Sequence, residues 1–404
     1  MPSKLLQKHA RIAERFQRMA AMGAIAVGPT NEQILSPTRA IINGRETVLA
    51  GTNNYMGITF EEDCIAAGKR ALDEFGTGTT GSRIANGSYA PHKELEEELA
   101  GMLGRKHCIV FTTGYQANLG MIAGLAGPRD TVFLDADSHS SIYDGCTLSG
   151  AKLVRFRHNN ADDLDKRLSR MDPDEEGGKL VVVEGIYSML GDRAPLDEFV
   201  EVKKKHGFEL LVDEAHSFGV LGPNGRGLAD EAGLESDCDY VVGTFSKSVG
   251  AIGGFGAGDD EMFDMIRYAS RPYMFTASPS PASVATSIAA VKKLRAEPQR
   301  RERLAANSAR LHAGFKDLGL QLGCEEVSPV IAVTCPDEVS TIAMWNALLN
   351  AGVYVNIALP PGTPSNVCLL RCSVSAAHTN DDIDLIVELF GKVVATGVHL
   401  AKSA

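Results

Sequence analysis

The sequence predicts an α/β fold built on a mostly parallel, doubly wound sheet. In the middle of the chain, short apolar runs alternate with helical stretches, and several runs are rich in β-branched residues. Such runs are typical of strands that are covered on both faces, and strand–helix alternation favours parallel pairing. Glycine accounts for 41 of the 404 residues, an excess over the average of about 7%. This excess indicates many tight turns and close backbone approaches.

The first 50 residues are expected to form a helical arm and a short hairpin. Ser3 to Met19 places apolar side chains at helical spacing among five basic residues and one acid, which predicts a basic amphipathic helix. Such a helix can lie on an anionic membrane surface, although packing on its own protein or on a partner subunit is the more common role. The hairpin is predicted at Ala40–Leu49.

Residues 51–285 are expected to form one large domain around the sheet. Helices are predicted at Leu164–Met171 and at Leu196–His206, where Pro195 stands at a helix start. The seven candidate strands are Cys108–Phe111, Thr131–Leu134, Leu153–Phe156, Leu180–Val183, Leu210–Val212, Tyr240–Val242 and Gly253–Gly256.

Residues 286–404 are expected to form a smaller α+β domain. A long amphipathic helical region, Ser283–Leu318, is broken near Pro298. The remaining predicted elements are strand Val330–Val333, helix Val339–Ala351, strand Tyr354–Asn356, a Pro/Gly loop at Leu359–Pro364, strand Val367–Cys372 and helix Asp381–Leu400.

Composition and charge exclude several classes of protein. The net charge of −11 argues against a surface that neutralises nucleic-acid phosphates, and no apolar run is long enough to span a membrane. The eight cysteines include no CxxC pair, and the histidines have no metal-ligand spacing, so no metal site is expected. The scattered cysteines favour reduced thiols in a cytoplasmic protein.

Polar and small residues follow four of the candidate strands at the edge where ligands bind in open α/β sheets. The stretches are Thr112–Tyr115, Asp137–His139, Asp213–His216 and Gly243–Ser248. The letters of Asp213–His216 also spell a helicase motif, but the chain has no GxxxxGK[ST] phosphate loop, so a nucleotide hydrolase is excluded.

Lys247 stands among small and hydroxyl-bearing residues directly after a buried-type strand. A lysine in a partly desolvated pocket can form an imine with a carbonyl, and neighbouring hydroxyl and backbone N–H groups suit a phosphate. Asp213, at the end of another strand, fits the acid that keeps a pyridine ring protonated. These groups together predict a pyridoxal 5′-phosphate (PLP) site.

The chain resembles the α-oxoamine synthases, PLP enzymes of fold type I that condense an amino acid with an acyl thioester and release CO2. Eight stretches carry the resemblance: Asn53–Gly57, Asp135–His139, Glu184–Asp192, Asp213–Gly219, Gly243–Phe255, Arg271–Ser278, Pro360–Pro364 and Leu369–Thr379. The resemblance implies a seven-stranded sheet and a homodimer with shared active sites. The stretches Arg271–Ser278 and Leu369–Thr379 favour L-serine and a long-chain acyl thioester as substrates.

The resemblance also implies roles for individual residues. Lys247 would bind the cofactor covalently, and Asp213 would pair with the ring nitrogen. His139 would stack on the ring, and His216 would hydrogen-bond the phenolic oxygen with help from Ser188. Arg371 would bind the carboxylate of the substrate, and Asn54 and Tyr55 would lie near it. The phosphate would be held by Gly114, Tyr115, Thr244 and Ser246, together with Thr276 from the second subunit.

Some questions stay open at this stage. Some relatives carry arginine directly before the PP[AG]TP loop, whereas this chain has Leu359. The acyl donor can be a coenzyme A or a carrier-protein thioester, and glycine or alanine can replace serine. Two different functions also stay open: a non-catalytic partner subunit, in which the lysine would be lost, and a PLP aminotransferase.

Overall fold

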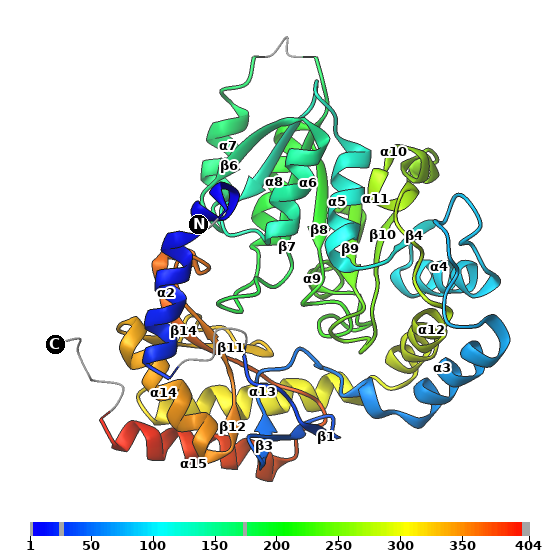
Figure 1. Ribbon diagram of the computed structural model, residues 1–404. Coiled ribbons are helices and arrows are strands. Elements are labelled where there is room, and N and C mark those ends of the chain that lie inside the picture. The colour runs from blue at the N-terminus through cyan, green and yellow to red at the C-terminus, as the bar shows by residue number, and fades with distance from the viewer. Residues whose placement is uncertain (1–2, 24–27, 173–175, 398–404) are drawn as a thin grey trace. The chain divides into compact units, whose positions relative to one another are not determined.

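The computed structural model describes residues 3–23, 28–172 and 176–397 (Figure 1). Contacts divide the chain into two units. Unit 1 is Met1–Thr52, Met189–Gly191 and Ala305–Ala404, and unit 2 is Asn53–Ser188 and Asp192–Leu304. Among the described residues, no helix has the length and apolar character needed to cross a bilayer.

Unit 2 contains the predicted seven-stranded sheet, and all seven candidate strands are present. Its strand order is β4-β10-β9-β8-β7-β5-β6, and only β10 is antiparallel to its neighbours. Every residue of β5, β9 and β10 is buried, as expected when both faces of a sheet are covered. The strands are β4 (His107–Phe111), β5 (Thr131–Asp135), β6 (Lys152–Phe156), β7 (Lys179–Glu184), β8 (Glu209–Asp213), β9 (Tyr240–Thr244) and β10 (Gly254–Gly258).

Helices of unit 2 pack on this sheet and on one another. Helix α5 contacts α6 and the strands β9 and β10, and α12 packs against α3 and α4 (Figure 1). The helices are α3 (Glu62–Phe75), α4 (Ala90–Leu103), α5 (Gly114–Leu125), α6 (Ser140–Ser149), α7 (Ala161–Leu168), α8 (Leu196–His206), α9 (Leu228–Ala232), α10 (Ile266–Ala269), α11 (Arg271–Met274) and α12 (Pro281–Ala296), with short 3₁₀ turns at Ile58–Phe60, Glu235–Asp237 and Phe263–Met265.

Unit 1 contains two small sheets with the orders β1-β2-β3-β12 and β11-β14-β13. The strands are β1 (Gln33–Ser36), β2 (Arg39–Ile42), β3 (Arg45–Leu49), β11 (Val330–Cys335), β12 (Val353–Tyr354), β13 (Asn356–Ala358) and β14 (Cys368–Ser373). The helices are α1 (Lys4–Gln7), α2 (Ala10–Ala21), α14 (Glu338–Ala351) and α15 (Asn380–Ala395), a 3₁₀ turn lies at Pro364–Asn366, and α13 (Gln299–Asp317) begins in unit 2 and ends in unit 1.

The structure corrects the predicted strand Tyr354–Asn356. Tyr354 ends β12, which pairs with β3, whereas Asn356 begins β13, which pairs with β14 in the other sheet. Val355, between them, is fully buried, and its carbonyl accepts a hydrogen bond of 2.8 Å from Trp345 Nε1. The chain therefore changes sheets at one residue, and a local pattern of apolar residues does not reveal such a change.

Other boundaries also differ from those expected. The N-terminal segment forms two helices, α1 and α2, rather than one. The last helix ends at Ala395, and residues 398–400 of the expected helix lie outside the described residues. The expected boundary at 285/286 falls inside α12, which packs on α3 and α4 and so belongs to unit 2. The N-terminal hairpin groups with the C-terminal region because β3 pairs with β12.

Candidate active site

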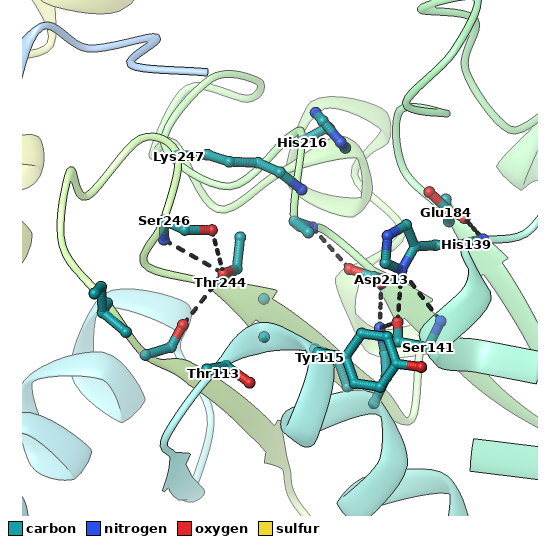
Figure 2. A pocket seen from close by; sticks show the side chains of 17 residues that line it. Thr113, Tyr115, His139, Ser141, Glu184, Asp213, His216, Thr244, Ser246 and Lys247 are labelled. Carbon is teal, nitrogen blue, oxygen red and sulfur yellow. Dashed lines mark hydrogen bonds between the residues drawn. The ribbon is translucent and has the colours of Figure 1, made fainter. Parts of the chain in front are cut away.

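A cavity of ≈330 Å³ opens in unit 2 at the carboxyl ends of the parallel strands. Such edges are the usual ligand sites of open α/β sheets. Eight of the predicted site residues line the cavity: Gly114, Tyr115, His139, Asp213, His216, Thr244, Ser246 and Lys247. Figure 2 shows Lys247 and His139 reaching toward this space from opposite sides, with Asp213 next to His139.

Asp213 is buried at the end of β8 and is fixed by two hydrogen bonds. Its Oδ1 accepts the Ala215 N–H at 2.9 Å, and its Oδ2 accepts Asn118 Nδ2 at 2.7 Å. Asn118 lies on α5 and also donates to Ser141 Oγ at 2.9 Å. A carboxylate held in this way presents a fixed negative charge to a cationic ring in the cavity.

The opposite end of the cavity has the features of a phosphate site. Helix α5 begins here, and Thr113 Oγ1 caps it by accepting the Gln116 N–H at 3.1 Å. Free N–H groups at a helix N-terminus attract anions. A Cβ added at Gly114 would lie 2.6 Å from Thr244, so only glycine allows this close approach. Thr244 Oγ1 and Ser246 Oγ are 2.9 Å apart and supply hydroxyl groups.

His139 is held by the first turn of α6 and by the end of β7. Its Nδ1 lies 2.7 Å from Ser141 Oγ, and its backbone N–H donates to Glu184. Burial lowers the pKa of His139, and the charge of Lys247 lowers it further against the opposing effect of Asp213. A neutral imidazole beside the cavity suits stacking on an aromatic ring better than a desolvated cation would.

His216 is oriented by a residue from a distant part of unit 2. Its Nδ1 lies 2.7 Å from the hydroxyl of Tyr55, and this hydroxyl also donates to Asn53 Oδ1 at 3.3 Å. Both rings are buried. Tyr55 therefore fixes the direction of His216 rather than lining the cavity itself.

The structure does not bring every predicted residue to the cavity. Of the described residues predicted for the site, Asn54, Tyr55, Ser188 and Thr276 belong to unit 2 but do not line this cavity. Asn54 donates to Thr59 Oγ1 at 2.8 Å, and Thr276 Oγ1 accepts Gln116 Nε2 at 3.2 Å. Arg371 is buried on β14 in unit 1, with its Nη1 3.2 Å from Ser373 Oγ.

The residues that line the cavity without a role in the sequence interpretation include Asn118, Ser141 and Glu184. Glu184 is aligned with Asp213 in the pairing of β7 with β8. Burial, reinforced by the charge of Asp213, raises the pKa of Glu184 well above its usual range. The position of Glu184 at the end of a predicted strand was a usable signal. Asn118 lies within a helix, where no local pattern marks it.

His158 forms a second missed feature, next to the loop that carries His139. Its Nδ1 lies 2.8 Å from Asp135 Oδ1 and its Nε2 lies 2.7 Å from Asp192 Oδ2. Burial alone would lower the pKa of His158, but the two carboxylates outweigh burial and raise it to about 10. Asp135 ends β5 and also accepts a hydrogen bond from the Asp137 N–H. The charged ring of His158 therefore stabilises, through Asp135, the start of the loop that carries His139.

Replacing His158 with glutamine is expected to lower the free energy of unfolding by about 3 kcal/mol at pH 6, because two acids lose their shared cation. The folded pKa lies above the unfolded value of about 6.5. The stabilisation is therefore complete below about pH 6.5 and is lost as the pH rises through about 10. Urea unfolding of the wild type and the variant at pH 6 and at pH 9.5 measures the loss of unfolding free energy at each pH. His9→Gln is the control, because His9 is exposed and its side chain makes no capping hydrogen bond at the start of α2, and it should leave the free energy of unfolding unchanged at both pH values. An equal loss in His158→Gln at the two pH values would contradict the bridging role.

Comparisons with known proteins extend these observations. Residues 46–390 match the family described as aminotransferase class I and II. The chain is 53% identical over 391 residues to a serine palmitoyltransferase of Caulobacter vibrioides, covering 97% of this chain and 96% of that protein. It is 53% identical to the serine palmitoyltransferase of Sphingomonas paucimobilis, covering 89% and 85%. A solved structure described as SPT with PLP internal aldimine has a TM-score of 0.95 and 50% identity, covering 98% and 100%.

Proposed function

We propose that this chain, which belongs to the aminotransferase class I and II family and to its α-oxoamine synthase group, has serine palmitoyltransferase activity. The reaction joins L-serine to the acyl group of palmitoyl-CoA and gives 3-ketosphinganine, CO2 and free thiol. The cofactor is PLP, which when bound supplies a cationic ring that takes up an electron pair from the Cα of the amino acid.

Lys247 and Asp213 are the residues to which we assign the central chemistry. Lys247 points into the cavity and is placed to bind the cofactor and then, as a free amine, to remove the proton from Cα of serine. The buried carboxylate of Asp213 keeps the ring nitrogen protonated. The convergence of these two side chains on one cavity is the observation that carries the proposal.

The other predicted residues are assigned supporting roles. His139 stacks on the ring and orients the substrate, and His216, fixed by Tyr55, hydrogen-bonds the phenolic oxygen together with Ser188. Gly114, Tyr115, Thr244 and Ser246 hold the phosphate at the N-terminus of α5. The roles of Arg371 in binding the serine carboxylate, and of Asn54 beside the site, rest on the resemblance to the family.

Purified holoenzyme is expected to convert L-serine and palmitoyl-CoA to 3-ketosphinganine, with one CO2 and one thiol released per product. Mass spectrometry identifies the product, and parallel reactions with glycine and L-alanine measure the choice of amino acid. A preference for glycine or alanine would indicate another α-oxoamine synthase. Transfer of the amino group without release of CO2 would indicate an aminotransferase. The presence of Lys247 in the cavity argues against a non-catalytic subunit.

A homodimer with shared active sites is part of the proposal. Unit 2 exposes several large apolar side chains, which a second subunit would cover if it packed on them. They include Ile252, Met262, Tyr268 and Phe275. The assignment of Thr276 to the partner's phosphate site rests on the resemblance to the family. Analytical ultracentrifugation at micromolar concentration is expected to give twice the chain mass of 43.1 kDa.

We further propose a cytoplasmic enzyme whose N-terminal segment touches the inner membrane surface. Lys4 and Lys8 flank Leu5 and Leu6, and all four side chains are exposed. Co-sedimentation with anionic vesicles tests this contact. We also propose a division into an arm (1–50), a large PLP-binding domain (51–285) and a C-terminal domain (286–404). Limited proteolysis tests it, and cleavage near Leu304 instead of near residue 285 would favour the division given by the contacts.

A further inference from the structure

A hydrogen-bond network links His139 to Asp213 through two buried residues, Asn118 and Ser141. Asn118 Nδ2 donates to Asp213 Oδ2 at 2.7 Å and to Ser141 Oγ at 2.9 Å. Ser141 Oγ in turn lies 2.7 Å from His139 Nδ1, and the backbone N–H of Ser141 donates to the same nitrogen at 3.2 Å. Figure 2 shows these last two contacts as dashed lines between His139 and Ser141.

The direction of each hydrogen bond in the network follows from what the groups can donate. The carboxylate of Asp213 only accepts, so the Asn118 amide must turn its NH2 group toward Asp213. This NH2 group has two protons, and the second is donated to Ser141 Oγ. Ser141 Oγ is therefore an acceptor toward Asn118, and its own proton is directed to His139 Nδ1.

The backbone of Ser141 decides which nitrogen of His139 carries the proton. A backbone N–H only donates, so His139 Nδ1 must be an acceptor. In a neutral imidazole with one accepting nitrogen, the proton lies on the other nitrogen, here Nε2. Figure 2 shows this second nitrogen on the side of the ring that faces Lys247 across the cavity. His139 thus meets a ligand as a hydrogen-bond donor.

The same contacts oppose a second proton on the ring. A proton on Nδ1 would face two donors, the hydroxyl and the backbone N–H of Ser141. Burial lowers the pKa of His139; among the charges that face the ring, Asp213 and Asp144 oppose this effect and Lys247 reinforces it. The ring is therefore held neutral, with its one proton at a fixed atom.

We propose that Asn118 and Ser141 are positioning residues that hold the proton of His139 on Nε2, so that the ring presents a donor to an anionic group of the ligand. A carboxylate suits this donor because it only accepts. The assignment of that group to the carboxylate of L-serine rests on the proposed function. The position of the proton rests on the donors around Nδ1.

Nitrogen NMR on the full-length protein, labelled with ¹⁵N-histidine, tests the position of the proton without any measurement of activity. A ring nitrogen that carries a proton and one that accepts a hydrogen bond differ in chemical shift. His139→Asn identifies the signals of this ring among the ten histidines. We expect the wild type, with and without PLP, to carry its proton on Nε2 between about pH 6 and pH 8. A proton on Nδ1 in the wild type would overturn the proposal, whether or not any variant folds.

Three variants test the residues around the ring. Ser141→Ala removes the hydroxyl donor, so we expect the titration midpoint of His139 to rise by roughly 0.5 pH unit or more. At pH 8, the less firmly held ring should raise the KM for L-serine about threefold or more and leave the KM for palmitoyl-CoA within about twofold. Asn118→Ala should raise the midpoint by a smaller amount, because Ser141 keeps its hydroxyl. Ser140→Ala is the matched control, since Ser140 is the exposed neighbour in the first turn of α6, and it should change neither quantity.

The variants give clear contrary results. An unchanged midpoint and an unchanged KM for L-serine in Ser141→Ala, or an equal change in Ser140→Ala, would overturn the role of Ser141. An unchanged midpoint in Asn118→Ala would overturn the role of Asn118. If the wild type carries its proton on Nε2 but the holoenzyme forms no product from L-serine, the proposed function fails while the position of the proton stands.

Discussion

Replacing Lys247 with alanine is expected to remove the visible absorbance of the bound cofactor and to lower turnover by at least about 10³-fold. Lys247 supplies the amine that binds the cofactor and the base that takes the Cα proton, so the variant loses both functions at once. Absorbance spectroscopy follows the first effect, and release of free thiol from palmitoyl-CoA follows the second.

Two further variants separate the chemistry of Lys247 from its charge. Lys247→Arg keeps a cation in the cavity, but guanidinium is not expected to replace a neutral amine in either role, so it should be as inactive as the alanine variant. Lys204→Ala, on the exposed side of α8, should behave as wild type. Turnover near the wild-type value in Lys247→Ala would refute the assignment.

Replacing Asp213 with asparagine is expected to lower kcat by about 10²-fold or more, because the ring nitrogen loses its buried anionic partner. The substitution keeps the shape of the side chain and allows hydrogen bonding to the Ala215 N–H. Cofactor binding should weaken less than turnover falls, since the phosphate end of the cavity is unchanged. Measurement of kcat alongside equilibrium binding of PLP distinguishes the two effects.

Glu209 provides the matched control for Asp213 because it lies at the exposed start of the same strand, β8. Glu209→Gln removes one negative charge from β8 without touching the cavity and should leave kcat within about twofold of wild type. If Asp213→Asn retained wild-type kcat, or if both variants lost activity equally, the pairing of Asp213 with the ring nitrogen would be wrong.

The sequence was sufficient to predict the large sheet because its strands are local features. Each is a short apolar run that ends in small or polar residues, and helix α8 begins and ends at the predicted residues Leu196 and His206. The same reasoning located the ligand edge, since the carboxyl ends of parallel strands lie together. The same reasoning could have predicted Glu184 as a site residue, because it ends β7 beside Asp213.

Features that depend on distant partners were not predictable in this way. The division of Tyr354–Asn356 between two sheets depends on where β3 and β14 lie, and neither is near in sequence. The charge of His158 depends on Asp135 and Asp192, which are 23 and 34 residues away. The ion pair of Arg15 with Glu338 also joins residues that are far apart in sequence. Periodicity alone showed the helix and its charges but not this partner.

Reduction with borohydride followed by peptide mass spectrometry tests the cofactor linkage most directly. Borohydride converts the imine between a lysine and the cofactor into a stable amine, which survives proteolysis. We predict one pyridoxyl group per chain, located on Lys247, and its absence after prior addition of excess L-serine. A pyridoxyl group on a different lysine, or no modification of a protein that is saturated with PLP, would contradict the account.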